Sequence, residues 1–237
     1  MRLDRYVAHA LGISRSDAQA LIKNRKVHLN QGLCTTIDRK IEEKDNISVN
    51  NEPVINETYH YIMLHKPKGY ISATTDKKHK TILDLIETNT PLAPIGRLDI
   101  DTEGLVILTN HGSLIHYLTA PKSLIWKTYY VKTLEPMNEG YIPRFQEGFD
   151  LYDGKKKLYH SEPAKLEIKN SFEAFVHIHE GKYHQIKKMF FAMKNEVIYL
   201  QRIAMGPIQL DPSLKVGDYR ALKAEEISNL LSLMKKR

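Results

Sequence analysis

A polar stretch near residue 50 divides this sequence into two parts with different apolar patterns. It runs from Asn50-Asn51-Glu52-Pro53 to Asn56-Glu57 and combines turn-forming residues with a proline, which is typical of a connection between domains. Only about a fifth of the 237 residues precede it, so we expect a small domain joined to a larger one. We place the small domain at residues 1–50, the linker at 51–58 and the larger domain at 59–237.

The first part has the pattern of two short helices followed by short strands. Leu3 and Val7 recur at helical spacing, and Gly12 is a suitable residue to end that helix. Ser14 can cap the start of a second helix with its hydroxyl. Strands are predicted at residues 27–29 and 47–49.

The second part contains many strand-like segments and few helical ones. Strands are predicted at 61–64, 105–108, 127–133, 164–168, 174–179 and 197–203. Helices are predicted at 81–86, 113–119, 184–193 and 224–234. Because the helices do not alternate regularly with the strands, we expect an α+β domain with a mixed or antiparallel sheet.

Charge and cysteine content limit the classes of partner and compartment. The chain has 35 Lys and Arg against 28 Asp and Glu, a net charge of +7 and a pI near 9.2, and a basic surface attracts polyanions. Cys34 is the single cysteine, so neither an internal disulfide nor a thiolate zinc cluster can form. No apolar run is long enough for a signal peptide core or a membrane span, so we expect a soluble cytoplasmic protein with no membrane partner.

The second predicted helix and the turn after it carry a group of basic residues, Arg15, Lys23, Arg25 and Lys26. With the apolar side chains turned inward, these four must face solvent, where they can contact phosphates. An ordinary solvated helix face explains the same charge run, so the run alone does not decide between the two.

The order of short motifs favours RNA binding. The run Arg2-Leu3-Asp4-Arg5, followed by Ser14-Arg15-Ser16 and by Val27-His28-Leu29-Asn30 with Gly32, resembles the S4 domain of ribosomal proteins and RNA-modifying enzymes. The resemblance implies that the first fifth of the chain binds structured RNA through its shape and its phosphates.

A glycine-bounded turn, Gly96-Arg97-Leu98-Asp99-Ile100-Asp101-Thr102-Glu103-Gly104, precedes a strongly apolar strand. Such a turn can hold a carboxylate rigidly at the edge of a cleft. The composition of this segment is equally typical of a charged surface loop or a metal-binding loop.

Three further segments complete a constellation with this turn. They are His65-Lys66-Pro67-Lys68-Gly69, Lys127-Thr128-Tyr129-Tyr130-Val131 and Gly181-Lys182-Tyr183-His184-Gln185-Ile186-Lys187-Lys188-Met189. In this order, with the S4-like start, they closely resemble the small-subunit ribosomal RNA pseudouridine synthase family. The resemblance extends to Gly217-Asp218-Tyr219-Arg220 and Glu225-Glu226-Ile227 near the C-terminus.

The resemblance implies roles for individual residues. Asp99 takes the position of the catalytic aspartate, Tyr129 that of the aromatic residue and Lys187 that of the basic residue. Two adjacent tyrosines point to opposite faces of a strand, so only one of Tyr129 and Tyr130 can line a site. Arg97 and Lys66 are predicted to contact RNA.

The chemistry agrees with those residue types. Forming pseudouridine breaks the N-glycosidic bond, turns the base and joins its C5 to the ribose, and bond breaking builds positive charge on the sugar. An anionic Asp99 can stabilise that charge, attack a carbon or remove a proton, and the sequence leaves these three open. Lys187 would keep Asp99 ionised, and Tyr129 would offer a flat face to the extruded base. No cofactor and no metal are expected.

Several alternatives stay open at this point. His177 and His179, with His184 nearby, resemble a metal site, but zinc also needs a third ligand in the right geometry and His184 belongs to the His-Gln motif. The alternating acids of the glycine-bounded turn resemble a calcium site, but the loop is too short for an EF-hand. The expected substrate is 16S rRNA or a small-subunit assembly intermediate, bound by a monomer. A synthase for 23S rRNA and a non-catalytic rRNA-binding assembly factor are the alternatives.

Overall fold

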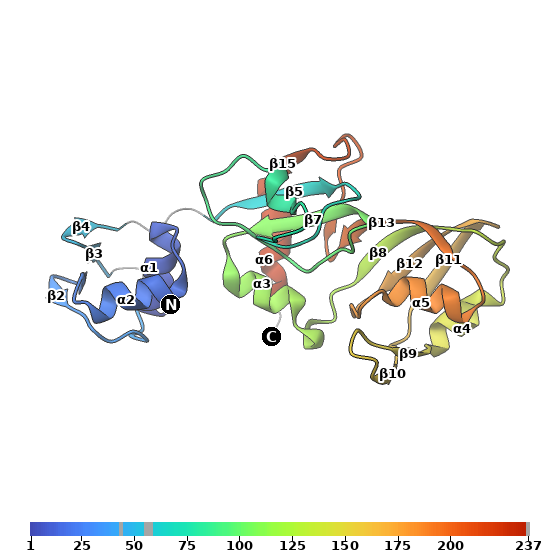
Figure 1. Ribbon diagram of the computed structural model, residues 1–237, viewed down its shortest axis with the longest axis horizontal. Helices are drawn as coiled ribbons and strands as arrows, with labels where there is room; N and C mark the ends of the chain where they lie inside the picture. Colours follow the sequence, from blue (N-terminus) through green and yellow to red (C-terminus); the bar gives the residue numbers. More distant parts are fainter. Residues whose placement is uncertain (43–44, 55–58, 236–237) are drawn as a thin grey trace. The chain divides into compact units, whose positions relative to one another are not determined.

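The computed structural model describes residues 1–42, 45–54 and 59–235 and divides into two compact units (Figure 1). The N-terminal unit comprises Met1–Tyr59 with Thr88–Pro91, and the C-terminal unit comprises His60–Glu87 with Leu92–Arg237. Among the described residues, no helix combines the length and the apolar character needed to cross a membrane.

The N-terminal unit packs two helices against a small antiparallel sheet. The helices are α1 (Leu3–Leu11) and α2 (Arg15–Lys23); the strands, in sheet order, are β2 (Gly32–Leu33), β1 (Val27–Leu29), β3 (Ile47–Val49) and β4 (Glu52–Pro53). Gly12 ends α1 in the left-handed conformation (φ 65°), and the Ser14 hydroxyl accepts a hydrogen bond from Asp17 N at 3.1 Å. The predicted helices and strands of this part are therefore confirmed.

The segment predicted as a linker, residues 51–58, begins inside this sheet. Glu52–Pro53 forms β4 and pairs with β3, so the expectation that the linker starts at residue 51 is wrong. Pro53 fits there because it lies in an edge strand, where its missing N–H costs no ladder bond. The rest of the predicted linker, residues 55–58, lies outside the described residues.

The C-terminal unit is built on one large mixed sheet. Its main path runs β11 (Lys165–Asn170), β12 (Glu173–Ile178), β8 (Lys127–Thr133), β13 (Val197–Met205), β7 (Glu103–Thr109), β5 (Tyr61–Lys66) and β15 (Tyr219–Ala221). Two short strands, β6 (Ala93–Pro94) and β14 (Ile208–Gln209), pair at its side. The β13–β7 pair is parallel and the other named pairs of this sheet are antiparallel, which confirms the predicted α+β class.

Helices cover this sheet in separate groups. They are the 3₁₀ turns η1 (Ile82–Leu85) and η2 (Pro121–Ser123) and the helices α3 (Gly112–Thr119), α4 (Tyr141–Glu147), α5 (Gln185–Ala192) and α6 (Ala224–Lys235). Helices α4 and α5 bury Phe145 and Phe190 against the strands that carry Val131 and Val176. Tyr117 of α3 donates a hydrogen bond to the Leu233 carbonyl of α6 at 2.7 Å.

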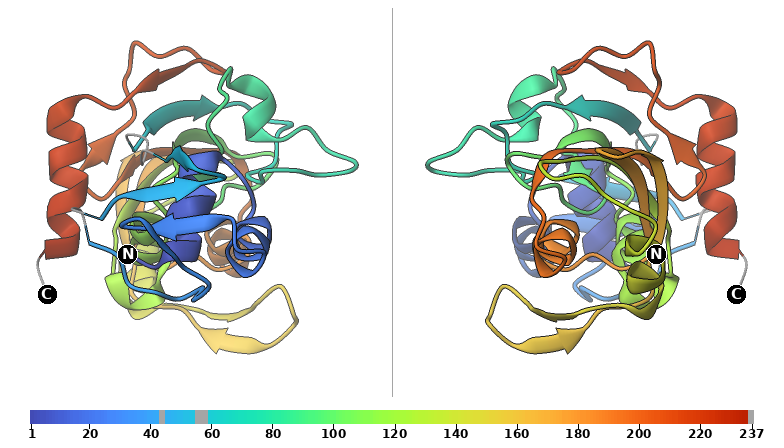
Figure 2. Two further views of the ribbon diagram at one scale, coloured as in Figure 1. Left: turned by 90° about the vertical axis from the view of Figure 1, so that its left-hand side faces the viewer. Right: turned by 90° about the vertical axis from the view of Figure 1, so that its right-hand side faces the viewer.

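Three features of this unit differ from the sequence-based expectation. The helix predicted at 81–86 is a 3₁₀ turn, closed by reciprocal hydrogen bonds between Thr81 and Asp84. Helix α4 was not predicted, because it is short and contains Pro143. The hairpin of β9 (Asp150–Tyr152) and β10 (Leu158–His160) was also missed; it projects from the body of the unit (Figure 2).

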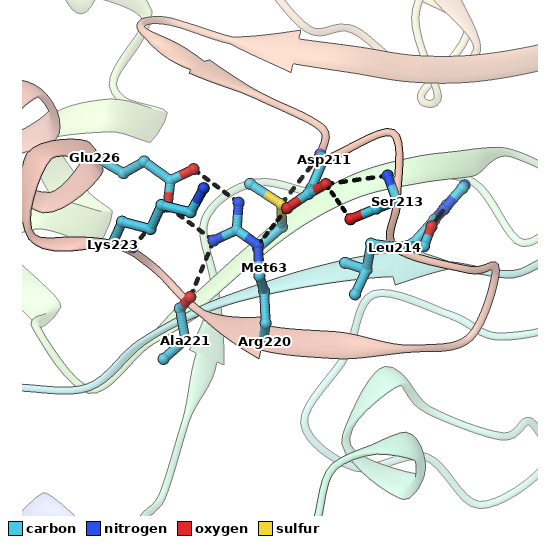
Figure 3. A network of polar contacts seen from close by, with 9 residues as sticks. Met63, Asp211, Ser213, Leu214, Arg220, Ala221, Lys223 and Glu226 are labelled. Atoms are coloured by element: carbon cyan, nitrogen blue, oxygen red, sulfur yellow. Dashed lines mark hydrogen bonds and ion pairs between the residues drawn. The ribbon is translucent and has the colours of Figure 1, made fainter.

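Arg220 of β15 fixes the C-terminal segment beside β5 (Figure 3). Its guanidinium donates two hydrogen bonds of 2.8 Å to the two oxygens of Glu226 and a third of 2.8 Å to Asp211. Hydrogen bonds from Ser213 and Arg220 lower the pKa of the Asp211 carboxyl to about 2, so both acids stay charged. This network supports the edge of the sheet next to the strand that ends at Lys66.

Candidate active site

The glycine-bounded turn lies between β6 and β7, and hydrogen bonds from Lys66 fix its backbone. The Lys66 ammonium at the end of β5 donates to the carbonyls of Pro67 (3.0 Å), Asp99 (3.0 Å) and Thr102 (2.8 Å). The Ser72 hydroxyl also bridges the N–H and C=O of Leu98 at 3.0 and 3.1 Å. The backbone around Asp99 is thus fixed on both sides.

Lys66 is fully buried and its ammonium already donates to three carbonyls, which contradicts the prediction that it contacts RNA. Burial lowers its pKa to about 8, although the nearby carboxylates of Asp101, Asp99 and Glu103 oppose that shift. Its three N–H groups match three carbonyls of one turn, which makes it a positioning residue for the turn rather than a ligand for phosphate.

The turn ends in Gly104 because its backbone conformation and its surroundings leave no room for a side chain. It has φ +108° and lies opposite Arg202 in the parallel β7–β13 pair, and a Cβ built on it would be 2.2 Å from the Arg202 carbonyl oxygen. Only glycine allows this approach, and the approach brings the turn next to β13.

Helix α5 and its N-cap residue bring two nitrogen-bearing side chains to Asp99. The Lys187 ammonium lies 3.8 Å from Oδ2 of Asp99, and Nε2 of His184 lies 3.7 Å from Oδ1. The shorter hydrogen bonds of Lys187 go to Asp101, at 2.5 and 2.7 Å. Lys187 therefore bridges the two aspartates, whereas the sequence predicted a pair with Asp99 alone.

Asp101 titrates differently from a free carboxyl because of this contact. Burial raises its pKa, but the hydrogen bond and charge of Lys187 outweigh burial, so the pKa lies below its usual value. Asp101 is thereby kept ionised as the tighter partner of Lys187, and the Asp99 oxygens lie at longer distances from Lys187 and His184.

Tyr129 of β8, rather than Tyr130, lines the cleft above Asp99. Tyr129 is 7% exposed and pairs across the sheet with Val176 and Arg202. Tyr130 belongs to the opposite face, where its ring lies 5.9 Å from Phe175 and 6.1 Å from Tyr199 (centroid distances). The alternation along the strand thus presents one tyrosine to the cleft.

The cleft has a volume of about 90 Å³. The predicted catalytic residues Asp99, Tyr129 and Lys187 all line it. Its other lining residues are Arg97, Leu98, Thr102, Ile178, Gly181, Lys182, His184, Gln185, Ile186 and Leu200. Asp99 is 29% exposed, so a carboxylate oxygen can be reached from solvent, while Tyr129 offers an almost buried wall. The arrangement suits a flat ring inserted beside a carboxylate with little space for water.

Comparison with known proteins identifies the family. Residues 60–192 match the family model described as RNA pseudouridylate synthase, and residues 1–47 match the S4 domain. The chain belongs to the RNA pseudouridine synthase family.

Relatives match this synthase over nearly its whole length. The ribosomal small subunit pseudouridine synthase A of Haemophilus influenzae is 38% identical, with 98% of this chain and 100% of the relative covered. The RNA pseudouridine synthase YtzG of Bacillus subtilis is 37% identical over 96% of this chain and 97% of its own. A crystal structure of a pseudouridylate synthase superposes with a TM-score of 0.69 at 37% identity, covering 97% of this chain and 99% of that one.

Two residues in and beside the cleft of this synthase were not predicted to act there. His184 is the N-cap residue of α5 and has a left-handed backbone (φ 54°), and its ring lies beside Asp99. Asp101 is the main partner of Lys187. The alternating acids of the turn were a visible signal for Asp101, whereas a single sequence does not show that His184 reaches Asp99.

The remaining predicted RNA contacts are on the surface. Arg97 is exposed at the rim of the cleft. In the N-terminal unit Arg15 is exposed at the start of α2, while Lys23, Arg25 and Lys26 are exposed at its end, about 12 Å further along the helix axis. These side chains are available to phosphates, and their RNA contacts remain predictions.

Arg15 also has a structural contact. It donates to the fully buried carboxylate of Asp4 at 2.9 Å, which also accepts from Arg2 at 3.1 Å and from Gln19 at 3.0 Å. Burial raises the pKa of Asp4, but these three hydrogen bonds together lower it to about 2. Arg15 is therefore oriented by an ion pair as well as being exposed.

Two of the histidines considered as a metal site lie at one end of β12. His177 and His179 lie on or just after β12, and the His177 ring contacts the Thr128 hydroxyl at 3.0 Å and Glu167 at 3.2 Å. Across the described part of the chain, no three His, Cys, Asp or Glu side chains are arranged to hold a metal ion.

Proposed function

We propose that this protein converts a uridine of small-subunit (16S) ribosomal RNA into pseudouridine, with Asp99 as the catalytic carboxylate. The relatives named ribosomal small subunit pseudouridine synthase A support the substrate. The observation that carries the catalytic assignment is the position of Asp99: a partly exposed carboxylate on a fixed turn, facing a lysine, a histidine and a buried tyrosine in one small cleft.

Each side chain has a task in this proposal. Asp99 places negative charge where the sugar becomes positive as the N-glycosidic bond breaks. Tyr129 presents its ring to the extruded uracil, and the small cleft keeps water from the sugar until C5 has joined it. Lys187 and His184 face the Asp99 oxygens at 3.8 and 3.7 Å, too far for short hydrogen bonds that would occupy those oxygens.

The S4 unit supplies RNA affinity in this proposal. Its exposed basic residues lie at both ends of α2, and phosphate contacts of this kind position an enzyme on a folded RNA without reading its bases. We propose that the protein acts in the cytoplasm on 16S rRNA or on an assembly intermediate of the small subunit, and that it acts as a monomer.

Tritium release from 5-³H-uridine tests the proposal directly. Small-subunit and large-subunit rRNA transcripts, and partly assembled particles of each, are incubated with the enzyme, and released tritium is counted. Release from small-subunit RNA alone, followed by mapping of one modified uridine, is the expected result. Release only from large-subunit RNA would replace the substrate, and tight binding without release from any RNA would favour an assembly factor.

A further inference from the structure

A second pocket, of about 480 Å³, lies behind Tyr129 and Arg97. It shares Arg97, Tyr129, Gly181 and Lys182 with the catalytic cleft, so the two are continuous around these residues. The charged residues that line it are Arg97, Lys127, Lys182 and Arg202 against Glu162 and Glu180. We call it the rear pocket.

Arg202 of β13 is the largest fully buried side chain of the rear pocket. It is 1% exposed, and its Nε donates to the Leu105 carbonyl at 2.8 Å. Nη2 has no hydrogen-bond partner, and Arg202 makes no ion pair with a carboxylate among the described residues. A buried guanidinium with free donors is costly, which indicates that a group absent from the protein itself completes it.

Gly96 leaves space beside this guanidinium. A Cβ built on Gly96 would lie 4.0 Å from Nη1 of Arg202, and both residues line the rear pocket. Any larger side chain at this position would fill the space next to Nη1. With glycine at this position, no side chain of residue 96 lies between Nη1 and the pocket.

Lys127 places a second, half-buried cation in the same pocket. Partial burial and the positive charge of Arg202 together lower its pKa to about 8, against the opposing charge of Glu180. Its ammonium donates to the Ile125 carbonyl at 3.0 Å and makes longer contacts of 3.4 and 3.5 Å with two other carbonyls. Among the described residues, no carboxylate forms an ion pair with Arg202 or Lys127.

The two acids that line the rear pocket, Glu162 and Glu180, do not pair with its cations. The Glu180 carboxylate accepts from Nε2 of Gln185 at 2.5 Å and from the backbone N–H of Glu162 at 2.9 Å. Glu162 itself is exposed. Neither acid forms an ion pair with Arg202 or Lys127, and the four cations of the lining outnumber the two acids, so an anion entering the pocket meets net positive charge.

We propose that the rear pocket receives a backbone phosphate of the substrate RNA next to the target uridine. The inference rests on the proposed function and adds the part of the substrate that is bound. A phosphate oxygen accepts from the free N–H groups of a guanidinium with good geometry, and its charge offsets the repulsion between Arg202 and Lys127. The uracil would lie on one side of Tyr129 and the phosphate on the other.

A double-mutant cycle between enzyme and RNA tests this placement. Synthetic RNAs carry a neutral methylphosphonate at one linkage at a time on either side of the mapped uridine. Dissociation constants and kcat/KM are measured with the wild-type enzyme and with Arg202→Gln, whose folding is checked by thermal unfolding. At one linkage we expect each single change to cost about 10-fold and the combined change to cost little more than either alone.

Two further variants make the cycle decisive. Lys127→Met repeats the cycle at the same linkage and replaces Arg202→Gln if that variant does not fold. Lys155→Met is the matched control, because Lys155 is exposed on the β9–β10 hairpin and lines neither pocket. Its effect should multiply with that of every methylphosphonate.

The outcomes separate this inference from the proposed function. Effects that multiply at every linkage for both Arg202→Gln and Lys127→Met would overturn the phosphate site, even with normal wild-type turnover. If no RNA were converted, the proposed function would fail, and the cycle in dissociation constants, carried out over each linkage of the RNA that binds most tightly, would still decide the pocket. Inhibition by inorganic phosphate at constant ionic strength, without a sensitive linkage, would show a site for a free anion and would also overturn the inference.

Discussion

The N-terminal unit and the synthase unit use positive charge in opposite ways. In the first, a buried carboxylate, Asp4, orients arginines whose charge stays at the surface. In the second, the cations Lys66 and Arg202 are buried and the carboxylate that matters, Asp99, is partly exposed. Exposed charges act over distance and are screened by salt, whereas buried cations fix backbone geometry and tolerate little change.

Lys66→Met should have the largest combined effect among the cationic residues. It leaves three carbonyls of the catalytic turn without their donor, so we expect a loss of about 2–4 kcal/mol of unfolding free energy and at least a 100-fold loss of turnover. Chemical denaturation and tritium release measure the two effects. Lys68→Met, at a neighbouring exposed lysine, is the control and should change both only slightly.

The pH dependence of the wild-type enzyme also tests whether the Lys66 ammonium supports the catalytic turn. The folded-state pKa of Lys66 is about 8, below its value in the unfolded chain, so the ammonium loses a proton as pH rises through about 8. Above that pH the Lys66 amine offers the turn two N–H donors in place of three, so turnover should fall. The fold should persist, because the lowered pKa means that Lys66 loses its proton more easily in the folded state than in the unfolded chain. A rate that stays flat up to pH 10 would contradict this role.

Lys187→Ala should cost less than the loss of Lys66 in stability but about 100-fold in turnover. The variant removes a bridge between Asp99 and Asp101, both of which remain on a fixed turn. Because the contact to Asp99 is 3.8 Å and mainly electrostatic, Lys187→Arg should recover most of the rate. Single-turnover rates at saturating enzyme measure this, and a Lys187→Arg variant as slow as Lys187→Ala would show that geometry, rather than charge, is required.

The N-terminal unit should show the smallest and most salt-dependent effects. Replacing Lys23, Arg25 and Lys26 by alanine removes three exposed charges, so affinity for rRNA should fall about 10-fold at low salt and the slope of log K against log salt should flatten by about 2–3. Turnover of bound RNA should not change. Filter binding over a salt series provides the measurement, and an unaltered slope would show that this end of α2 does not contact the RNA.

Much of this architecture could be predicted from the sequence because its signals are local. The apolar alternation of β8 and the Ser14 cap act over a few residues, and the resemblance of the motifs placed Asp99, Tyr129 and Lys187 in one cleft. The burial of Lys66 was missed because it depends on β7 and β15 packing on either side of β5, which is a long-range property. A lysine that ends an almost wholly apolar strand was the available hint.

The contacts of Lys187 with both aspartates and the unpartnered Nη2 of Arg202 could not be predicted from the sequence for a related reason. Both depend on distances of a few ångströms between segments far apart in the chain. Composition and spacing place such residues in the same region, but they do not decide which of two aspartates, two residues apart, takes the shorter hydrogen bonds.

The most direct test of the account compares Asp99→Asn with Asp101→Asn in single-turnover tritium release from small-subunit rRNA. The two substitutions are chemically identical and two residues apart on one turn, and both residues contact Lys187. We expect Asp99→Asn to release no measurable tritium while its RNA affinity stays within about 2-fold, and Asp101→Asn to lose about 10-fold in rate. Turnover near the wild-type rate by Asp99→Asn, or a complete loss confined to Asp101→Asn, would contradict the assignment of the catalytic carboxylate.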